Sequence, residues 1–379
     1  MRVVIAPDSF KGSCSAPAAA AALAEGLRAG WPELAPHLLP IADGGEGTVE
    51  ALVSATGGRL VEAEARDPLG RLIQATYGVL GEGNTAVIEM AAASGLPLLA
   101  EAERNPELTS TLGTGDLIRH ALNLGCRKLL LGIGGSATND AGTGMAVALG
   151  AKLYSEAGIE LEPSGAALSE LASLDLSELD PRLAETEVLV ACDVTNPLFG
   201  PHGAAHVYAP QKGASPEQVA RLETGLRRFA EVIKRDLGLH LAEQPGAGAA
   251  GGLGAGLVAF CGAKLKPGAD LVLDTVHFEE RLAGARLVIT GEGKLDAQTA
   301  YGKAIARVAT RAKLLEIPVV AIVGSLEADT TALARLGLAA ALPLVQGPTT
   351  LELAMHDAEA LLQAAGERLA QLLRLGSIL

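Results

Sequence analysis

Short apolar runs that alternate with helical patterns make up most of this chain. Residues 2–6 form one such run, and the Ala-rich segment 15–29, with Pro17 in its first turn, has the pattern of a helix. Further strands are expected over 37–42, 286–290, 317–323 and 339–345, and further helices near 48–57 and over 302–314 and 350–373. Because strands that alternate with helices favour a parallel sheet, this pattern predicts a doubly wound α/β fold.

The segment 59–90 has a different pattern, with longer extended pieces. These pieces cover 59–66, 71–80 and 85–90, and turn signals separate them at 67–70 and 81–84. Turns that combine Gly with Asp, Asn or Pro connect antiparallel strands. We therefore expect a mixed sheet in this part of the chain.

The length of 379 residues favours two domains, because a single hydrophobic core rarely serves a chain of this size. We expect a discontinuous doubly wound domain from residues 1–57 and 280–379. Residues 58–279 would then form a second, inserted α/β domain with a mixed sheet, and both boundaries are soft. The glycine-rich run 246–256 reads either as a flexible hinge or lid or as a second backbone cradle for a ligand.

Composition excludes several classes of partner. The formal net charge of −14, without a basic stripe, argues against binding to nucleic acid. No apolar run approaches the ~20 residues of a membrane span, and no secretory leader precedes the first strand. Four scattered cysteines without CxxC spacing suggest reduced thiols, so we expect a cytoplasmic protein. We expect it to be either a monomer or a homodimer.

Five turns combine glycine or proline with polar side chains at the ends of predicted strands. They lie at residues 7–13, 43–48, 132–140, 193–197 and 291–299. In open α/β sheets this edge is where ligands bind. Carboxylates, lysines and phosphate-binding backbone are what phosphoryl transfer requires, although the chain lacks the Walker and protein-kinase motifs.

The turn that follows the apolar run 129–131 has the strongest local signal. Gly132, Gly134 and Gly135 lack Cβ atoms, so that backbone N–H groups can approach an anion. The same residues, with Ala137 and a ribose-binding acid at Glu156, also fit a loose dinucleotide fingerprint. A plain strand-to-helix turn is the third reading.

Seven motifs, taken in order, resemble those of the bacterial class I glycerate kinases over nearly the whole chain. They are Ala6-Pro-Asp-Ser-Phe-Lys-Gly-Ser13, Asp43-Gly-Gly-Glu-Gly-Thr48, Gly132-Ile-Gly-Gly-Ser-Ala-Thr-Asn-Asp140, Cys192-Asp-Val-Thr-Asn-Pro-Leu198, Pro210-Gln-Lys-Gly-Ala214, Gly248-Ala-Ala-Gly-Gly-Leu-Gly254 and Thr290-Gly-Glu-Gly-Lys-Leu-Asp296. Ala141 departs from the family, which commonly has a second Gly there. The resemblance implies phosphorylation of D-glycerate by ATP with Mg²⁺, usually to 2-phosphoglycerate. It also implies that the discontinuous domain is Rossmann-like and is joined to a distinct α/β domain.

Individual roles are assigned by chemistry. Asp193, Lys11 and Asp43 are the expected catalytic residues, with Asp193 as general base or Mg²⁺ ligand and Asp296 as a further metal ligand. Asp193 could instead cap its own turn. Residues expected to bind substrate or phosphate are Asp8, Ser9, Ser13, Gly134, Gly135, Ser136, Thr138, Asn139, Gln211, Lys212, Glu292 and Lys294.

Two other functions stay open at this point. A nicotinamide-dependent dehydrogenase of a small hydroxy acid would use residues 132–137 as its fingerprint. A non-catalytic sensor of a small acid would need fewer carboxylates near phosphate-binding turns. The residues alone do not distinguish a 2-phosphoglycerate from a 3-phosphoglycerate product.

Overall fold

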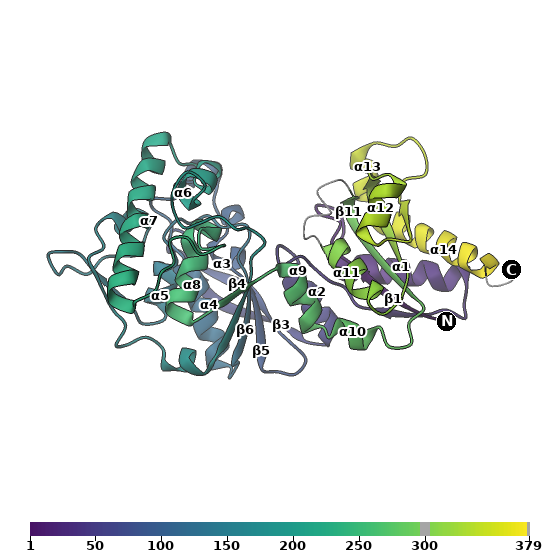
Figure 1. Ribbon diagram of the computed structural model, residues 1–379, viewed down its shortest axis with the longest axis horizontal. Helices are drawn as coiled ribbons and strands as arrows, with labels where there is room; N and C mark the ends of the chain where they lie inside the picture. Colours follow the sequence, from purple (N-terminus) through teal and green to yellow (C-terminus); the bar gives the residue numbers. More distant parts are fainter. Residues whose placement is uncertain (296–303, 377–379) are drawn as a thin grey trace. The chain divides into compact units, whose positions relative to one another are not determined.

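The computed structural model describes residues 1–295 and 304–376, and the chain divides into two compact units (Figure 1). Unit 1 consists of Met1–Asp43, Gly47–Gly58 and Ala269–Leu379, and unit 2 consists of Gly44–Glu46 and Arg59–Gly268. Each unit combines helices with a sheet, which confirms the predicted α/β class.

A parallel sheet of five strands, in the order β13-β12-β11-β1-β2, forms the centre of unit 1. These strands are β1 (Arg2–Pro7), β2 (Ala35–Leu38), β11 (Leu287–Leu295), β12 (Val319–Leu326) and β13 (Ala340–Pro343). β1 pairs with β11, with Val3 opposite Leu287 and Ile5 opposite Ile289. The first strand of the chain is thus held by a strand from its last third.

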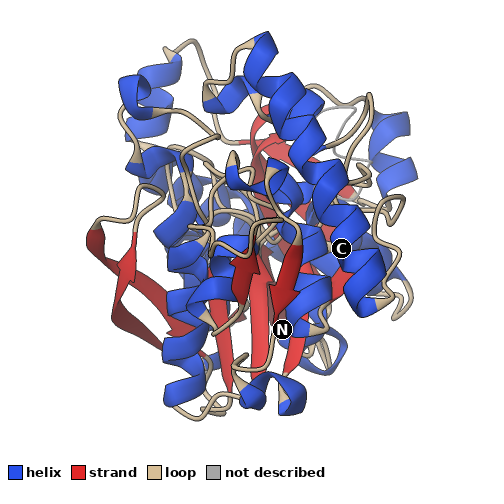
Figure 2. Ribbon diagram, turned by 90° about the vertical axis from the view of Figure 1, so that its left-hand side faces the viewer, coloured by secondary structure: helices blue, strands red, loops and turns tan. Residues whose placement is uncertain are grey.

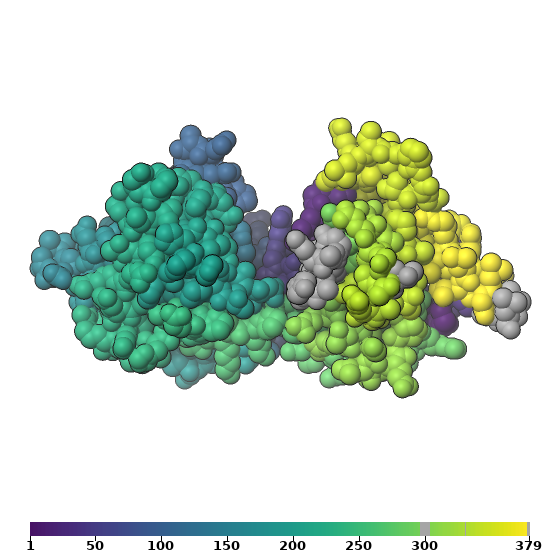
Figure 3. All heavy atoms as spheres, turned by 45° about the horizontal axis from the view of Figure 1, so that its top comes forward, coloured from purple at the N-terminus to yellow at the C-terminus, as the bar shows by residue number. Residues whose placement is uncertain are grey.

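The helices of unit 1 are α1 (Ala16–Gly30), α2 (Thr48–Thr56), α9 (Gly268–Thr275), α10 (Phe278–Arg281), α11 (Ala304–Lys313), α12 (Thr330–Leu336), α13 (Leu351–His356) and α14 (Ala358–Gly376). α1 and α14 pack against each other, and the purple N-terminal and yellow C-terminal segments lie in the same unit in Figures 1 and 3.

Glycines bring α1 and α14 into backbone contact. A Cβ atom at Gly26 would lie 1.9 Å from the backbone oxygen of Gln363, and one at Gly366 would lie 2.6 Å from that of Leu23. Larger residues would force the helices apart. The two ends of the chain are therefore locked together above the sheet, over the buried side chains of Ile5 and Ile289.

Unit 2 contains a mixed sheet of six strands in the order β10-β9-β6-β5-β4-β3 (Figure 2, strands in red). The strands are β3 (Arg59–Arg66), β4 (Leu72–Val79), β5 (Thr85–Glu89), β6 (Lys128–Gly132), β9 (Glu187–Ala191) and β10 (Lys264–Lys266), and a separate ribbon joins β7 (Lys152–Tyr154) to β8 (Ser173–Asp175). β10, β9, β6 and β5 pair in parallel, whereas β4 is antiparallel to both β5 and β3. Both predicted hairpins are confirmed.

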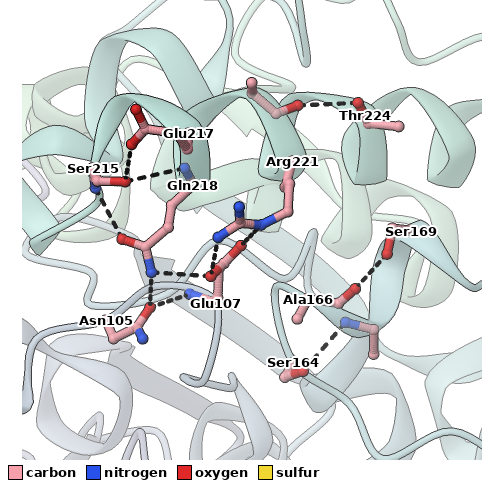
Figure 4. Close-up of polar contacts among 12 residues, drawn as sticks. Asn105, Glu107, Ser164, Ala166, Ser169, Ser215, Glu217, Gln218, Arg221 and Thr224 are labelled. Atoms are coloured by element: carbon pink, nitrogen blue, oxygen red, sulfur yellow. Dashed lines mark hydrogen bonds and ion pairs between the residues drawn. The ribbon is translucent and has the colours of Figure 1, made fainter.

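The α-helices described in unit 2 are α3 (Ala91–Ser94), α4 (Leu112–Asn123), α5 (Thr143–Ala148), α6 (Ala204–Tyr208), α7 (Pro216–Leu237) and α8 (Leu253–Cys261). α7 begins with a capping box, in which Ser215 and Gln218 satisfy each other's backbone N–H groups. The Gln218 amide also donates to Glu107, which forms an ion pair with Arg221 at 2.7 Å (Figure 4). These contacts fix the start of α7 to the segment that precedes α4.

Two elements near the C-terminus differ from the sequence prediction. Residues 291–295, expected as a turn, continue β11 because β12 pairs with them as far as Leu295. The single helix expected over 350–373 is two helices, α13 and α14. The apolar stripe of the predicted single helix places Leu351 and Leu372 in the core, whereas they are 76% and 58% exposed.

The glycine-rich run 246–256 is neither a hinge nor a lid. All of it except Ala250 is buried in unit 2. A Cβ atom at Gly251 would lie 2.0 Å from the Thr138 oxygen, and one at Gly256 would lie 2.3 Å from the Ala141 oxygen. The glycines therefore serve close packing of backbone on backbone.

Within the described residues, no helix has both the length and the apolar character needed to cross a membrane. All four cysteines are free thiols, as expected from their spacing.

Candidate active site

A cavity of about 570 Å³ opens at the carboxyl edge of the parallel sheet in unit 1. The chain proceeds from β1 to β2 on one side and from β11 to β12 and β13 on the other, so the strand order reverses between β1 and β11. Ligands of open α/β sheets bind at such a reversal. Asp8, which follows β1, and Glu292, within β11, both line the cavity.

Three carboxylates make one end of the cavity acidic. Asp8 and Glu292 are buried, and Asp43 is partly exposed. Burial raises the pKa of Asp8 to about 7, and the negative charges of Asp43 and Glu292 add to this effect. A hydrogen bond of 2.6 Å from the Ser9 N–H and the charge of Lys11 act in the opposite direction.

Two lysines also line the cavity. The Lys11 ammonium lies 3.6 Å from an Asp43 carboxylate oxygen, and its side chain is 67% exposed. The Lys294 ammonium lies 2.9 Å from a Glu327 carboxylate oxygen, and the Lys294 side chain is also exposed. Both ammonium groups can move toward a phosphate with little desolvation cost. By contrast, the Ser13 hydroxyl already donates to the Met355 carbonyl at 2.8 Å.

The acidic end fits a magnesium ion bound in part by its ligand. Among residues 1–295 and 304–376, no group of three or more His, Cys, Asp or Glu side chains is arranged to hold a metal. Mg²⁺, however, usually needs only one or two carboxylates, with phosphate oxygens and water as its other ligands. Asp8 and Asp43 supply such a pair, and their mutual repulsion shows that a cation would stabilise them. Asp296 lies outside the described residues.

In unit 2, Asp140 organises the turn that follows β6. Its buried carboxylate accepts hydrogen bonds from the Thr111 N–H and hydroxyl at 2.7 and 2.8 Å, and from the N–H groups of Gly142 and Gly144 at 3.2 Å. α5 begins only at Thr143, so the segment 133–142 is irregular. The alternative reading of this turn as a dinucleotide fingerprint requires that it open directly into a helix, which it does not. A Cβ atom at Gly132 would lie 2.7 Å from the Gly44 oxygen, so this glycine allows close packing of backbone on backbone.

Lys212 lies behind this turn. Its ammonium donates to the Ser136 hydroxyl and the Thr138 carbonyl, both at 2.7 Å, and its side chain is 1% exposed. Burial lowers the pKa of Lys212 to about 7, whereas the charge of Asp140 acts to raise it. The neighbouring Gln211 is exposed, in contrast to Lys212.

The turn presents backbone to solvent and keeps polar side chains beneath it. Gly134 and Gly135 are exposed, and Ser136 is 9% exposed. The Thr138 hydroxyl and both amide atoms of Asn139 are buried without a hydrogen-bond partner. Unsatisfied buried groups of this kind usually bind water or a ligand.

Asp193 follows β9 and is exposed. One of its carboxylate oxygens accepts a hydrogen bond of 2.9 Å from the N–H of Gly268. The structure thus groups Asp8, Lys11, Asp43, Glu292 and Lys294 in one cavity of unit 1, and it groups Ser136, Thr138 and Lys212 in one cluster of unit 2.

Sequence reasoning missed two parts of this arrangement. Residues 344–361 form a cavity wall, whereas the sequence predicted only a strand over 339–345 and a helix over 350–373 there. The second part is Asp140, whose carboxylate accepts hydrogen bonds from Thr111 in another segment of the chain. Nothing in the local sequence indicates this contact.

Comparison with known proteins gives concordant results. The model of the glycerate kinase family matches residues 3–374. Glycerate kinase of Bacillus subtilis (strain 168) is 47% identical, with 99% of this chain and 98% of the relative covered. Glycerate 2-kinase of Escherichia coli (strain K12) is 45% identical, with 99% of both covered. A crystal structure assigned provisionally as glycerate kinase 2 of Salmonella typhimurium LT2 is 48% identical, covers both chains fully and has a TM-score of 0.92. None of these matches supports the dehydrogenase or the sensor.

Replacing Asp8 should change how stability depends on pH. The carboxyl ionises near 3.8 when unfolded and near 7 when folded, so the folded state binds more protons between these values. Stability contributed by the protonated carboxyl is therefore present below pH ~4 and lost as the pH rises through 7. Asp8→Asn should raise the melting temperature at pH 8 by at least ~2 °C and change it little at pH 4.5. Melts in a metal chelator test this, and parallel pH profiles for both proteins would contradict it.

Replacing Lys212 should destabilise unit 2. Lys212→Met preserves the size of the side chain but leaves the Ser136 hydroxyl and the Thr138 carbonyl without this donor. We expect a loss of roughly 1–3 kcal/mol in the free energy of unfolding, measured in urea. Lys234→Met, at an exposed site on α7, is the control and should stay within ~0.5 kcal/mol of the parent. Equal stability of the two variants would show that the buried contacts contribute nothing.

Proposed function

The chain belongs to the glycerate kinase family and is a phosphotransferase with an alcohol group as acceptor, and from this premise we propose that it phosphorylates D-glycerate with ATP. The proposed product is 2-phosphoglycerate. Its main support is the 45% identity, over 99% of the chain, to a relative named glycerate 2-kinase. The grouping of carboxylates and lysines at the carboxyl edge of unit 1 suits this chemistry.

In unit 1, Lys11 and Lys294 would bind phosphate oxygens, because both are exposed cations beside the cavity. Asp8 and Asp43 would hold Mg²⁺, with Glu292 close to them and Ser9 orienting Asp8. Bound Mg²⁺ would supply positive charge that offsets the negative charge of the transferred phosphoryl group. The lysines would contribute to the same stabilisation through direct hydrogen bonds.

In unit 2, the backbone N–H groups of Gly134 and Gly135 would bind an anionic group, either a carboxylate or a phosphate. Ser136 would assist. Lys212 donates to the Ser136 hydroxyl oxygen, so the Ser136 O–H can point toward an anion. Thr138 and Asn139 have buried polar atoms that such a ligand or its water could satisfy. Gln211 is exposed nearby and stays a candidate contact.

We assign Asp193 as the general base that accepts the proton of the glycerate hydroxyl. It is an exposed carboxylate at a strand end, and it accepts a hydrogen bond from the Gly268 N–H. A carboxylate in this position can accept a proton without losing its place in the fold.

The reaction itself is tested by incubating the protein with ATP, Mg²⁺ and D-glycerate. We expect ADP to form only when glycerate is present. When NAD replaces ATP, we expect no reduction of NAD. Phosphorus NMR of the product should show a doublet, because a phosphate on the 2-hydroxyl couples to one proton. A triplet would place the phosphate on the 3-hydroxyl and overturn the proposed product, and absence of glycerate-dependent ADP would overturn the proposed function.

Asp193→Asn should abolish turnover without unfolding the protein. The amide oxygen can still accept the Gly268 N–H, whereas the negative charge is lost. We expect kcat to fall by at least ~100-fold, with a melting temperature close to that of the parent.

The matched control is Asp175→Asn, because Asp175 accepts the Ser177 N–H at 2.9 Å in an ordinary turn. This variant should retain kcat within about threefold of the parent. If Asp193→Asn behaves in the same way, Asp193 is a turn residue and not the base.

A further inference from the structure

We propose that the apolar end of the cavity in unit 1 binds the nucleoside of ATP, an inference that rests on the proposed function. The lining is chemically divided. Asp8, Lys11 and Asp43 supply charge at one end, whereas residues 344–361 supply mostly apolar side chains. A nucleoside triphosphate has the same division, with charged phosphates at one end and a flat base at the other.

The size of the cavity favours a nucleotide over glycerate. Its volume of about 570 Å³ lies within the range of ~300–1,000 Å³ that is typical for sites of drug-sized ligands. Glycerate has three carbons, and each bears a carboxylate or hydroxyl oxygen that needs a polar partner. The side chains of Leu344, Val345 and Leu361 in the cavity wall are hydrocarbon and offer no such partner.

The wall also exposes apolar surface that a base could cover. Leu351 is 76% exposed, and Met355 lines the same part of the cavity. Thioether side chains adapt to flat apolar groups, so Met355 suits a purine face. The hydrogen bond from Ser13 to the Met355 carbonyl holds α13 beside the turn that carries Lys11. Base and phosphate contacts would therefore belong to one rigid wall.

Hydroxyl groups accompany the apolar wall and suit a ribose. Ser325 follows the buried part of β12, and Thr349 and Thr350 precede α13. Thr350 caps this helix by accepting the Leu353 N–H at 3.3 Å, so its hydroxyl proton can still be donated. Gly293 also lines the cavity, where it leaves space that a side chain would occupy.

The first test uses a tryptophan on the apolar wall. Leu351→Trp changes an exposed side chain, and Glu352→Trp on the same helix is the matched control because Glu352 does not line the cavity. The native chain has one tryptophan, Trp31, which both variants share. ADP should change the emission of Leu351→Trp only, and pyrophosphate should leave it unchanged because it lacks the base.

The second test fills the space. Ala354 is half-buried on the cavity side of α13, so Ala354→Trp should weaken ADP binding by at least ~10-fold in calorimetry. Its KM for glycerate should stay within about threefold of the parent, and a thermal melt confirms folding. Glu352→Trp should bind ADP like the parent.

The outcomes separate this inference from the proposed function. The nucleoside site alone is overturned if the parent enzyme is active but both variants fail to respond as expected. In that case Ala354→Trp binds ADP as tightly as the parent, and ADP does not change the emission of Leu351→Trp. If Ala354→Trp raises only the KM for glycerate, the cavity belongs to the acceptor, and the nucleoside site is again overturned. If the parent forms no glycerate-dependent ADP but Leu351→Trp responds to ADP and not to pyrophosphate, the nucleoside site stands and the kinase assignment fails.

Discussion

The pairing of β1 with β11 is the contact on which the rest of unit 1 depends. It joins the start of the chain to its last third, and the glycine contacts between α1 and α14 hold the same two ends from above. Asp8 and Lys11 come from the first segment, and Glu292 and the wall around Leu351 come from the second. Without this long-range pairing the cavity would lack the lining residues of one of the two segments.

The two polar centres of the chain differ in how their charges are balanced. At the cavity of unit 1, Asp43 and Glu292 add repulsion to the buried Asp8, so the folded protein retains repulsion that a ligand can relieve. At the turn of unit 2, Asp140 is almost fully supplied with donors and Lys212 is buried behind the loop. The first arrangement suits binding of cations, and the second holds a backbone in a fixed shape.

Sequence patterns predicted the α/β class, both hairpins and the turns that carry the polar residues, because these features depend on short-range chemistry. They failed where tertiary contacts decide. Residues 291–295 look like a turn but pair with β12. Lys212 was expected to bind substrate or phosphate, whereas its ammonium is buried and donates to Ser136 and Thr138. The roles of Asp193 and of the phosphate-binding residues depend on a bound substrate, which neither composition nor spacing represents.

The buried glycine run has a consequence for protein engineering. By composition, residues 246–256 resemble the flexible joints at which tags, fluorescent domains or circular-permutation cuts are usually placed. Here a Cβ atom at Gly248 would meet the Pro197 oxygen at 2.2 Å, and one at Gly254 would meet the Gly246 oxygen at the same distance. An insertion at this point would separate three backbone segments that lie in contact, so the part of the chain that looks most permissive is among its least tolerant.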